Sequence, residues 1–147
     1  MPPVPLVIHE RIGNWARQLR PRTAGWPVQV VETRSGPELA AALAARPWPL
    51  AVVDLADRPE AALRELAEGL DDLPDALLLV LDPTNAPGAA ALARELGATQ
   101  VTSGFAPPPA VVDLLARWLP IARARAGAAG WVAEPPRVAE PWEPSTP

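Results

Sequence analysis

The sequence predicts one α/β domain in which a parallel sheet is covered by helices on both faces. Two observations carry this prediction: short apolar runs at residues 6–8, 50–55 and 76–81, and the helical segments that separate them. Apolar runs without polar alternation are typical of parallel strands that are buried on both faces. Strands and helices that alternate through short connections favour a parallel sheet, because each crossover is right-handed. The 147 residues suit a single core.

Five strands are predicted in chain order, and a helix follows each of them. The strands are expected at residues 6–8, 27–31, 50–55, 76–81 and 99–102. The third is almost entirely apolar, as a central parallel strand requires, and the fifth is short and weaker. This βαβαβαβαβα order fits the flavodoxin-like doubly wound fold, whose sites lie at the carboxyl ends of the strands.

Start and stop signals mark the helices between these strands. Ser35 and Glu38 form a capping box, with Pro37 in the first turn where its missing N–H costs nothing. Gly97 closes a short helix over residues 87–96 as a left-handed cap. The first helix is expected to end near Pro21. Residues at helical spacing that we expect to face the core are Ile12, Trp15, Ala16 and Leu19, then Leu63, Leu66 and Leu70, and finally Val112, Leu115 and Leu119.

The domain is predicted to span residues 1–125, and residues 126–147 form a separate tail. Five prolines and two glycines interrupt this segment, so it is expected to be extended or disordered rather than helix or strand. Trp131 and Trp142 stand out in the tail, because aromatic anchors in Pro-rich segments favour docking into a pocket. The alternative is that they fold back onto their own domain or are unstructured.

Composition excludes several kinds of site. The chain has no Cys, so disulfides, thiolate metal sites and Cys nucleophiles are excluded. All thirteen basic residues are Arg, which excludes chemistry that needs a Lys ammonium group. A net charge of −4 argues against general binding to nucleic acid. No apolar run reaches the roughly 20 residues of a membrane span, and no secretory signal is present, so we expect a cytoplasmic protein.

Polar residues at the strand ends carry a resemblance to a known family. Asp54 follows the apolar third strand, His9 and Glu10 end the first, Asp82 ends the fourth, and Gly97-Ala98 precedes the fifth. This layout resembles the receiver domain of two-component response regulators over roughly residues 5–125. The resemblance implies that Asp54 occupies the phosphoacceptor position and that His9-Glu10 stands where receivers hold Mg²⁺ with an acidic pair.

The same resemblance implies that the phosphotransfer site is degenerate. Receivers end the fourth strand with a Thr or Ser hydroxyl, where Asp82 stands here, and the fifth with a Lys, where Gly104 stands. Phosphoryl transfer depends on positive charge around the equatorial oxygens, so the missing Lys opposes it. A carboxylate at Asp82 would add repulsion of about 1 kcal/mol at ~4 Å even in water. We therefore expect that Asp54 is an inactive relic and that no catalysis occurs.

Two interpretations remain open for the polar residues. Glu10, Asp54 and Asp82 form either an acidic pocket that attracts Mg²⁺ or a solvated acidic rim without a metal. His9 is either a ligand or base, or a loop residue whose hydrogen bonds are satisfied. No Gly-rich phosphate loop or hydrolase elbow occurs in the sequence, so we expect a protein that is not an enzyme.

The functional hypothesis is a pseudo-receiver that acts as a protein–protein interaction module in signalling or assembly. By the resemblance, its contact residues would be Phe105, Pro107 and Trp118, with Trp131 and Trp142 in the tail. The partner would be a protein, with a homodimer as one form, and neither nucleic acid nor membrane. One alternative is an atypical phospho-receiver that uses Asp54 with Mg²⁺. The other is a scaffold protein that docks through its C-terminal tail.

Overall fold

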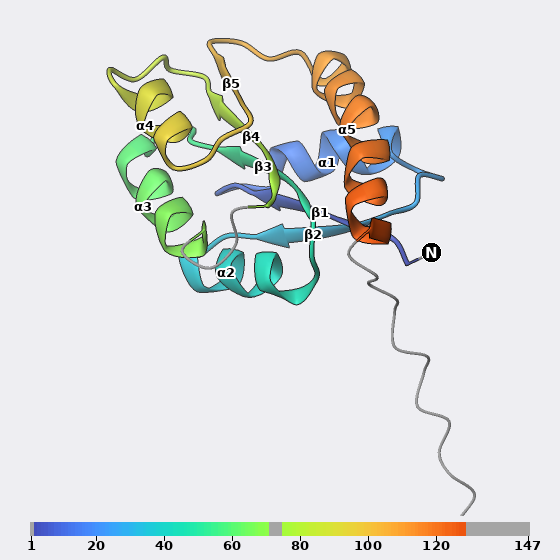
Figure 1. Cartoon of the computed structure of the whole chain (residues 1–147). Helices are drawn as coiled ribbons and strands as arrows, with labels where there is room; N and C mark the ends of the chain where they lie inside the picture. The colour runs from blue at the N-terminus through green and yellow to red at the C-terminus, as the bar shows by residue number, and fades with distance from the viewer. Residues whose placement is uncertain (1, 71–74, 129–147) are drawn as a thin grey trace, which may run out of the picture.

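A five-stranded parallel sheet lies between two layers of helices in the computed structural model, which describes residues 2–70 and 75–128 (Figure 1). The strand order is β2-β1-β3-β4-β5, which confirms the flavodoxin-like prediction. The elements in chain order are β1 (Val4–His9), α1 (Asn14–Arg22), β2 (Val28–Thr33), α2 (Gly36–Ala45), β3 (Leu50–Asp54), α3 (Pro59–Leu70), β4 (Leu77–Asp82), α4 (Ala89–Glu95), β5 (Gln100–Ser103) and α5 (Pro108–Ala128).

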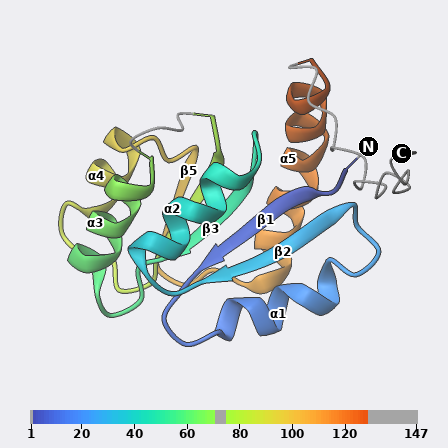
Figure 2. The same ribbon diagram turned by 90° about the horizontal axis from the view of Figure 1, so that it is seen from below.

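The two helical layers enclose two hydrophobic cores, one on each face of the sheet. Helices α1 and α5 cover one face, and α2, α3 and α4 cover the other (Figure 1, Figure 2). Residues such as Trp15 and Leu115 fill the first core, whereas Leu39 and Leu66 fill the second. Strands β1 and β4 are buried along their whole length, because side chains on both faces meet a helical layer.

Local sequence signals set two of the helix ends. The Ser35 hydroxyl accepts a hydrogen bond from the backbone N–H of Glu38 at 3.3 Å, and it donates to the Glu38 carboxylate at 3.1 Å. The predicted capping box is therefore closed through the two side chains. Gly97 has a φ of +111° after α4, and the N–H of Ala98 bonds the carbonyl of Ala93 at 2.9 Å. This is the left-handed termination that the glycine predicts.

Helix α1 begins later than its apolar spacing predicts. Ile12 lies in the loop before the helix and is 75% exposed, so its assignment to the core stripe is wrong. The helix starts after Gly13, whose φ is +79° and whose missing Cβ would lie 2.8 Å from the Arg34 guanidinium. A side chain at position 13 would therefore be strained by the positive φ and would displace the Arg34 guanidinium. Pro21 is accommodated inside the last turn of the helix.

Helix α5 turns a different stripe toward the core than predicted. Its buried residues are Val111, Leu114, Leu115, Trp118 and Ala122, whereas the predicted Val112 and Leu119 are only partly buried. Trp118 is 7% exposed and belongs to the core, which corrects its assignment to an interaction surface. The helix continues to Ala128, three residues beyond the predicted domain end. The predicted tail from residue 129 onward, with Trp131 and Trp142, lies outside the described residues.

Within residues 2–70 and 75–128, no helix has the length and apolar character needed to cross a membrane.

Candidate functional site

The carboxyl ends of β1, β3, β4 and β5 bring the predicted polar residues to one edge of the sheet. His9 ends β1 and Glu10 follows it, Asp54 ends β3, Asp82 ends β4, and Gly104 follows β5. The edge of a doubly wound sheet where the strand order reverses is where such folds place their binding sites. The surroundings of each side chain decide what this edge can do.

Glu10 is committed to the start of α1. Glu10 is 4% exposed, and both of its carboxylate oxygens accept a hydrogen bond from the Trp15 backbone N–H, at 2.9 and 2.7 Å. A carboxylate at a helix amino end stabilises the free N–H groups there. Burial raises the pKa of Glu10, although the hydrogen bonds from Trp15 and Ala16 oppose this effect. Glu10 and Asp54 line the same small pocket, where the negative charge of Asp54 raises the Glu10 pKa further and the positive charge of Arg34 lowers it.

His9 is a buried residue of β1 rather than a loop residue. It is 3% exposed, and both ring nitrogens are within hydrogen-bond distance of other side chains. Nδ1 lies 2.8 Å from the Thr33 hydroxyl, and Nε2 lies 2.5 Å from the Glu65 carboxylate of α3. His9 therefore has its hydrogen bonds satisfied and ties β1 to β2 and α3. Neither nitrogen is left for a metal or for a substrate.

Asp54 is half-buried, and one of its oxygens is engaged. Oδ1 accepts a hydrogen bond from the backbone N–H of Ala56 at 3.0 Å. Burial raises the pKa of Asp54, the Ala56 hydrogen bond opposes this, and the charge of Asp57 adds to the rise. Arg11, Arg34 and Arg58 line the same small pocket as Asp54, but within residues 2–70 and 75–128 none of them forms an ion pair or hydrogen bond with its carboxylate.

Asp82 does not share the surroundings of Asp54. The strand register pairs Asp54 with Leu81, so Leu81 points to the same face as Asp54 and Asp82 points to the other. Asp82 Oδ1 accepts a hydrogen bond from the Ala86 N–H at 3.1 Å. Its Oδ2 is buried without a partner among the described residues. The expected repulsion between Asp82 and Asp54 is therefore corrected: an apolar leucine is the β4 neighbour of Asp54.

The position of the missing Lys holds a turn. Gly104 has a φ of +83°, and its N–H donates to the carbonyl of Asp82 at 2.8 Å. Three arginines line the small pocket beside Asp54; among the described residues, Arg11 and Arg34 contact other groups, whereas the Arg58 side chain has no partner. Arg34 donates to the Arg11 carbonyl at 2.8 Å, and the Arg11 guanidinium lies 3.6 Å from the carboxylate of Asp57.

These residues do not fit Mg²⁺, the ion that the resemblance implies. The space enclosed by His9, Glu10, Arg34 and Asp54 measures only about 10 Å³. That volume holds one water molecule at most, whereas Mg²⁺ usually keeps several. No group of three or more His, Asp and Glu side chains within residues 2–70 and 75–128 is arranged to hold a metal ion. The expected three-carboxylate pocket is not assembled, because only Glu10 and Asp54 come together.

A largely apolar cleft opens on the other side of Asp54. Its volume is about 400 Å³, and its apolar lining includes Trp15, Leu81, Phe105 and Pro108. Phe105 is 85% exposed and, like Ile12, lies on a loop at this edge of the sheet. The exposure of Phe105 agrees with its predicted place on a surface, and Pro107 is exposed beside it. The exposed position of Ile12 at this edge was not predicted from the sequence, although the glycine that follows it marks it as a loop residue.

No protein-family model and no curated protein matches this chain. Solved structures do. The receiver domain of an HD domain-containing protein from Pseudomonas fluorescens Pf-5 aligns with a TM-score of 0.70 and 13% identity, over 86% of this chain and 94% of that one. The receiver domain of a putative LuxO repressor protein from Vibrio parahaemolyticus gives 0.68 and 13%, over 89% and 100%.

A response regulator from Burkholderia pseudomallei, solved with a phosphorylated aspartic acid and calcium, aligns with a TM-score of 0.61 and 21% identity. That match covers 89% of this chain and 77% of the other. Identities this low show a shared fold alone, so the chemistry of this chain has to be inferred from its own residues. The chain therefore has the fold of response-regulator receiver domains.

Proposed function

We propose that this chain is a non-catalytic receiver-fold module that binds a protein partner in signalling or assembly. The observation that carries the proposal is the apolar character of the edge around Asp54. Leu81 and the exposed Phe105 border the cleft where a phosphoryl group would need a hydroxyl and a cation. An exposed aromatic side chain beside a concave apolar surface is typical of a protein contact.

Phosphorylation is disfavoured by the same surroundings. Asp54 lies near the carboxylates of Glu10 and Asp57 and has no ion pair with an arginine among the described residues, so a phosphoryl group would add negative charge beside two carboxylates without a paired cation. Glu10, which the resemblance assigns to Mg²⁺, caps α1 instead. The module is therefore expected to bind its partner constitutively, without a phosphorylation switch.

The burial of Phe105 would supply much of the contact energy. Moving an exposed phenylalanine out of water contributes about 1.5–3 kcal/mol, which corresponds to roughly a tenfold to hundredfold change in affinity. Because this side chain is 85% exposed in the free protein, replacing it should leave the fold intact. A polar substitution therefore separates loss of binding from loss of folding.

The test is quantitative affinity capture from cells that express the chain, with Phe105→Glu compared against Ile121→Glu. Ile121 is an exposed apolar residue of α5, 42% exposed, and controls for the added charge. We expect specific partners with the wild type and Ile121→Glu that are depleted at least tenfold with Phe105→Glu. Equal recovery by Phe105→Glu, or no specific partner for any of the three, would overturn the proposal.

A further inference from the structure

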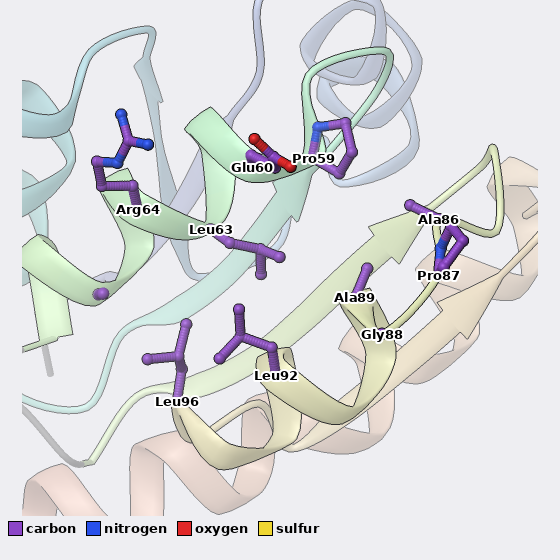
Figure 3. Close-up of a pocket in the computed structure, with 11 residues that line it drawn as sticks. Pro59, Glu60, Leu63, Arg64, Ala86, Pro87, Gly88, Ala89, Leu92 and Leu96 are labelled. Carbon is purple, nitrogen blue, oxygen red and sulfur yellow. The ribbon is translucent and has the colours of Figure 1, made fainter.

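A cavity lies between α3 and α4 and shares no lining residue with the Asp54 cleft. It is an open groove of about 610 Å³, in the size range of a ligand site. Figure 3 shows Leu63 of α3 facing Leu92 and Leu96 from the α4 side, with Pro87 at one end. Leu92 is 43% exposed, so the groove presents an uncovered apolar surface.

Two charged side chains stand on the α3 rim of this groove. Glu60 and Arg64 are one helical turn apart and both line it (Figure 3). Neither side chain takes part in a hydrogen bond or an ion pair with another residue in the described ranges 2–70 and 75–128. Helix α3 runs from the carboxyl edge of the sheet toward the amino edge, so Arg64 lies nearer the amino edge than Glu60 does.

We propose that the groove is the docking site for this chain's own C-terminal segment around Trp142. The segment has the composition that such a groove accepts: an aromatic side chain for the apolar floor, and prolines on either side at Pro141 and Pro144. Apolar grooves bind Pro-rich segments with few ordering costs, because proline already restricts the backbone. The proposal does not depend on the partner-binding role of Phe105.

The length of the chain beyond α5 distinguishes Trp142 from Trp131. Helix α5 ends at Ala128, and its last turns lie beside Pro3 and Trp48 at the amino edge, on the face opposite α3 and α4. Fourteen residues follow Ala128 up to and including Trp142. In a polyproline conformation they span about 43 Å, which exceeds the ~36 Å diameter expected for a domain of this size. Trp131 is three residues away, with a reach of only about 10 Å, and cannot cross to the other face.

Charge favours the same placement. Glu140 and Glu143 flank Trp142 in the sequence. A segment that arrives from the amino edge meets Arg64 before Glu60, so Glu140 would pair with the Arg64 guanidinium, which has no partner among the described residues. Glu60, at the end of the groove nearer the carboxyl edge, would lie closest to the Glu143 carboxylate. Repulsion between these two carboxylates would limit how far the segment extends along the groove.

The absence of cysteine from the chain makes the proposal directly testable. A Ser145→Cys variant of the full chain carries a single nitroxide label next to Trp142. We expect paramagnetic broadening of amide signals from α3 and α4 around Leu63 and Leu92, and none around α1. The control for contacts between molecules is a mixture of two chains, one with the isotope label and no nitroxide, the other with the nitroxide and no isotope label. This mixture should show no such broadening.

Matched variants decide between specific docking and proximity. Leu92→Glu in the labelled chain should lose the broadening, whereas Ile121→Glu, at an almost equally exposed apolar position on α5, should retain it. Trp142→Ala should also lose it. Broadening that survives Leu92→Glu, or that maps to another surface, would overturn the proposal. Broadening in the mixed sample would assign the groove to a second copy of the chain instead.

Discussion

Removing the side chains of His9 and Glu65, singly and together, should reveal a coupling of about 1.5–2 kcal/mol in the free energy of unfolding. The two residues are 56 positions apart in the chain, and their contact connects the end of β1 to α3. The variants are His9→Ala, Glu65→Ala and the double replacement. Loss of the Thr33 contact of His9 occurs in both His9 variants and therefore cancels in the cycle.

The magnitude follows from burial and geometry. Hydrogen bonds that involve a charged group contribute about 1.5–3 kcal/mol when they are formed in a protein interior. The contact here is short, at 2.5 Å, and His9 is 3% exposed. The Glu65 side chain retains 20% exposure, so solvent recovers part of the loss and the lower end of that range applies.

A more exposed ion pair of similar length provides the control. Arg20 and Glu32 lie 2.7 Å apart, with side chains that are 50% and 34% exposed. Such pairs contribute less than about 1 kcal/mol. Urea unfolding followed by tryptophan fluorescence measures both cycles under identical conditions. A coupling for His9 and Glu65 that is no larger than that for Arg20 and Glu32 would refute the structural role assigned to His9.

Two further substitutions test the edge of the sheet. Burial raises the pKa of Asp54 above its ordinary value of 3.8, so between these two pH values the folded state binds more protons than the unfolded state. The contribution of Asp54 to stability is therefore most favourable below pH 3.8 and is lost as the pH rises through the raised pKa. Asp54→Asn, which keeps the acceptor for Ala56, should unfold at a higher urea concentration than the wild type at pH 7, with a smaller difference at pH 3. Gly104→Lys should lower the free energy of unfolding by about 1 kcal/mol, because φ is +83° and only the backbone is strained in the open space there. A neutral effect in urea unfolding would contradict the turn assigned to Gly104.

The fold could be predicted because its signals are local. Continuous apolar runs define β1, β3 and β4, and they are buried on both faces as their composition requires. The capping box at Ser35 and the glycine at position 97 fix two helix ends through contacts within a few residues. The composition of the strands and the signals at the helix ends therefore agree on the same architecture, a parallel sheet between two helical layers.

The candidate site was predictable only in part, because strand register is a long-range property. Asp54 and Asp82 both end buried strands, and the sequence treats them alike. A shift of one residue between β3 and β4 places Leu81 beside Asp54 and turns Asp82 to the opposite face. The contact of His9 with Glu65 likewise depends on how α3 crosses the sheet, which the sequence pattern does not encode.

Helix α5 shows how a wide apolar surface obscures the phase of a helix. Val111 and Val112, Leu114 and Leu115, and Trp118 and Leu119 are paired apolar neighbours. Helical spacing alone allows either member of each pair to face the core. The structure buries Val111 and Trp118, the first members of the first and last pairs. Packing against β1 and β3, rather than spacing within the helix, decides the phase.

Intact mass spectrometry after incubation of the full chain with a small phosphodonor and Mg²⁺ tests the central claim most directly. Asp54 has no ion pair with a cation among the described residues, and the space between it and Glu10 is too small for a hydrated Mg²⁺, so we predict an unchanged mass. A gain of one phosphoryl group that Asp54→Asn abolishes would contradict it.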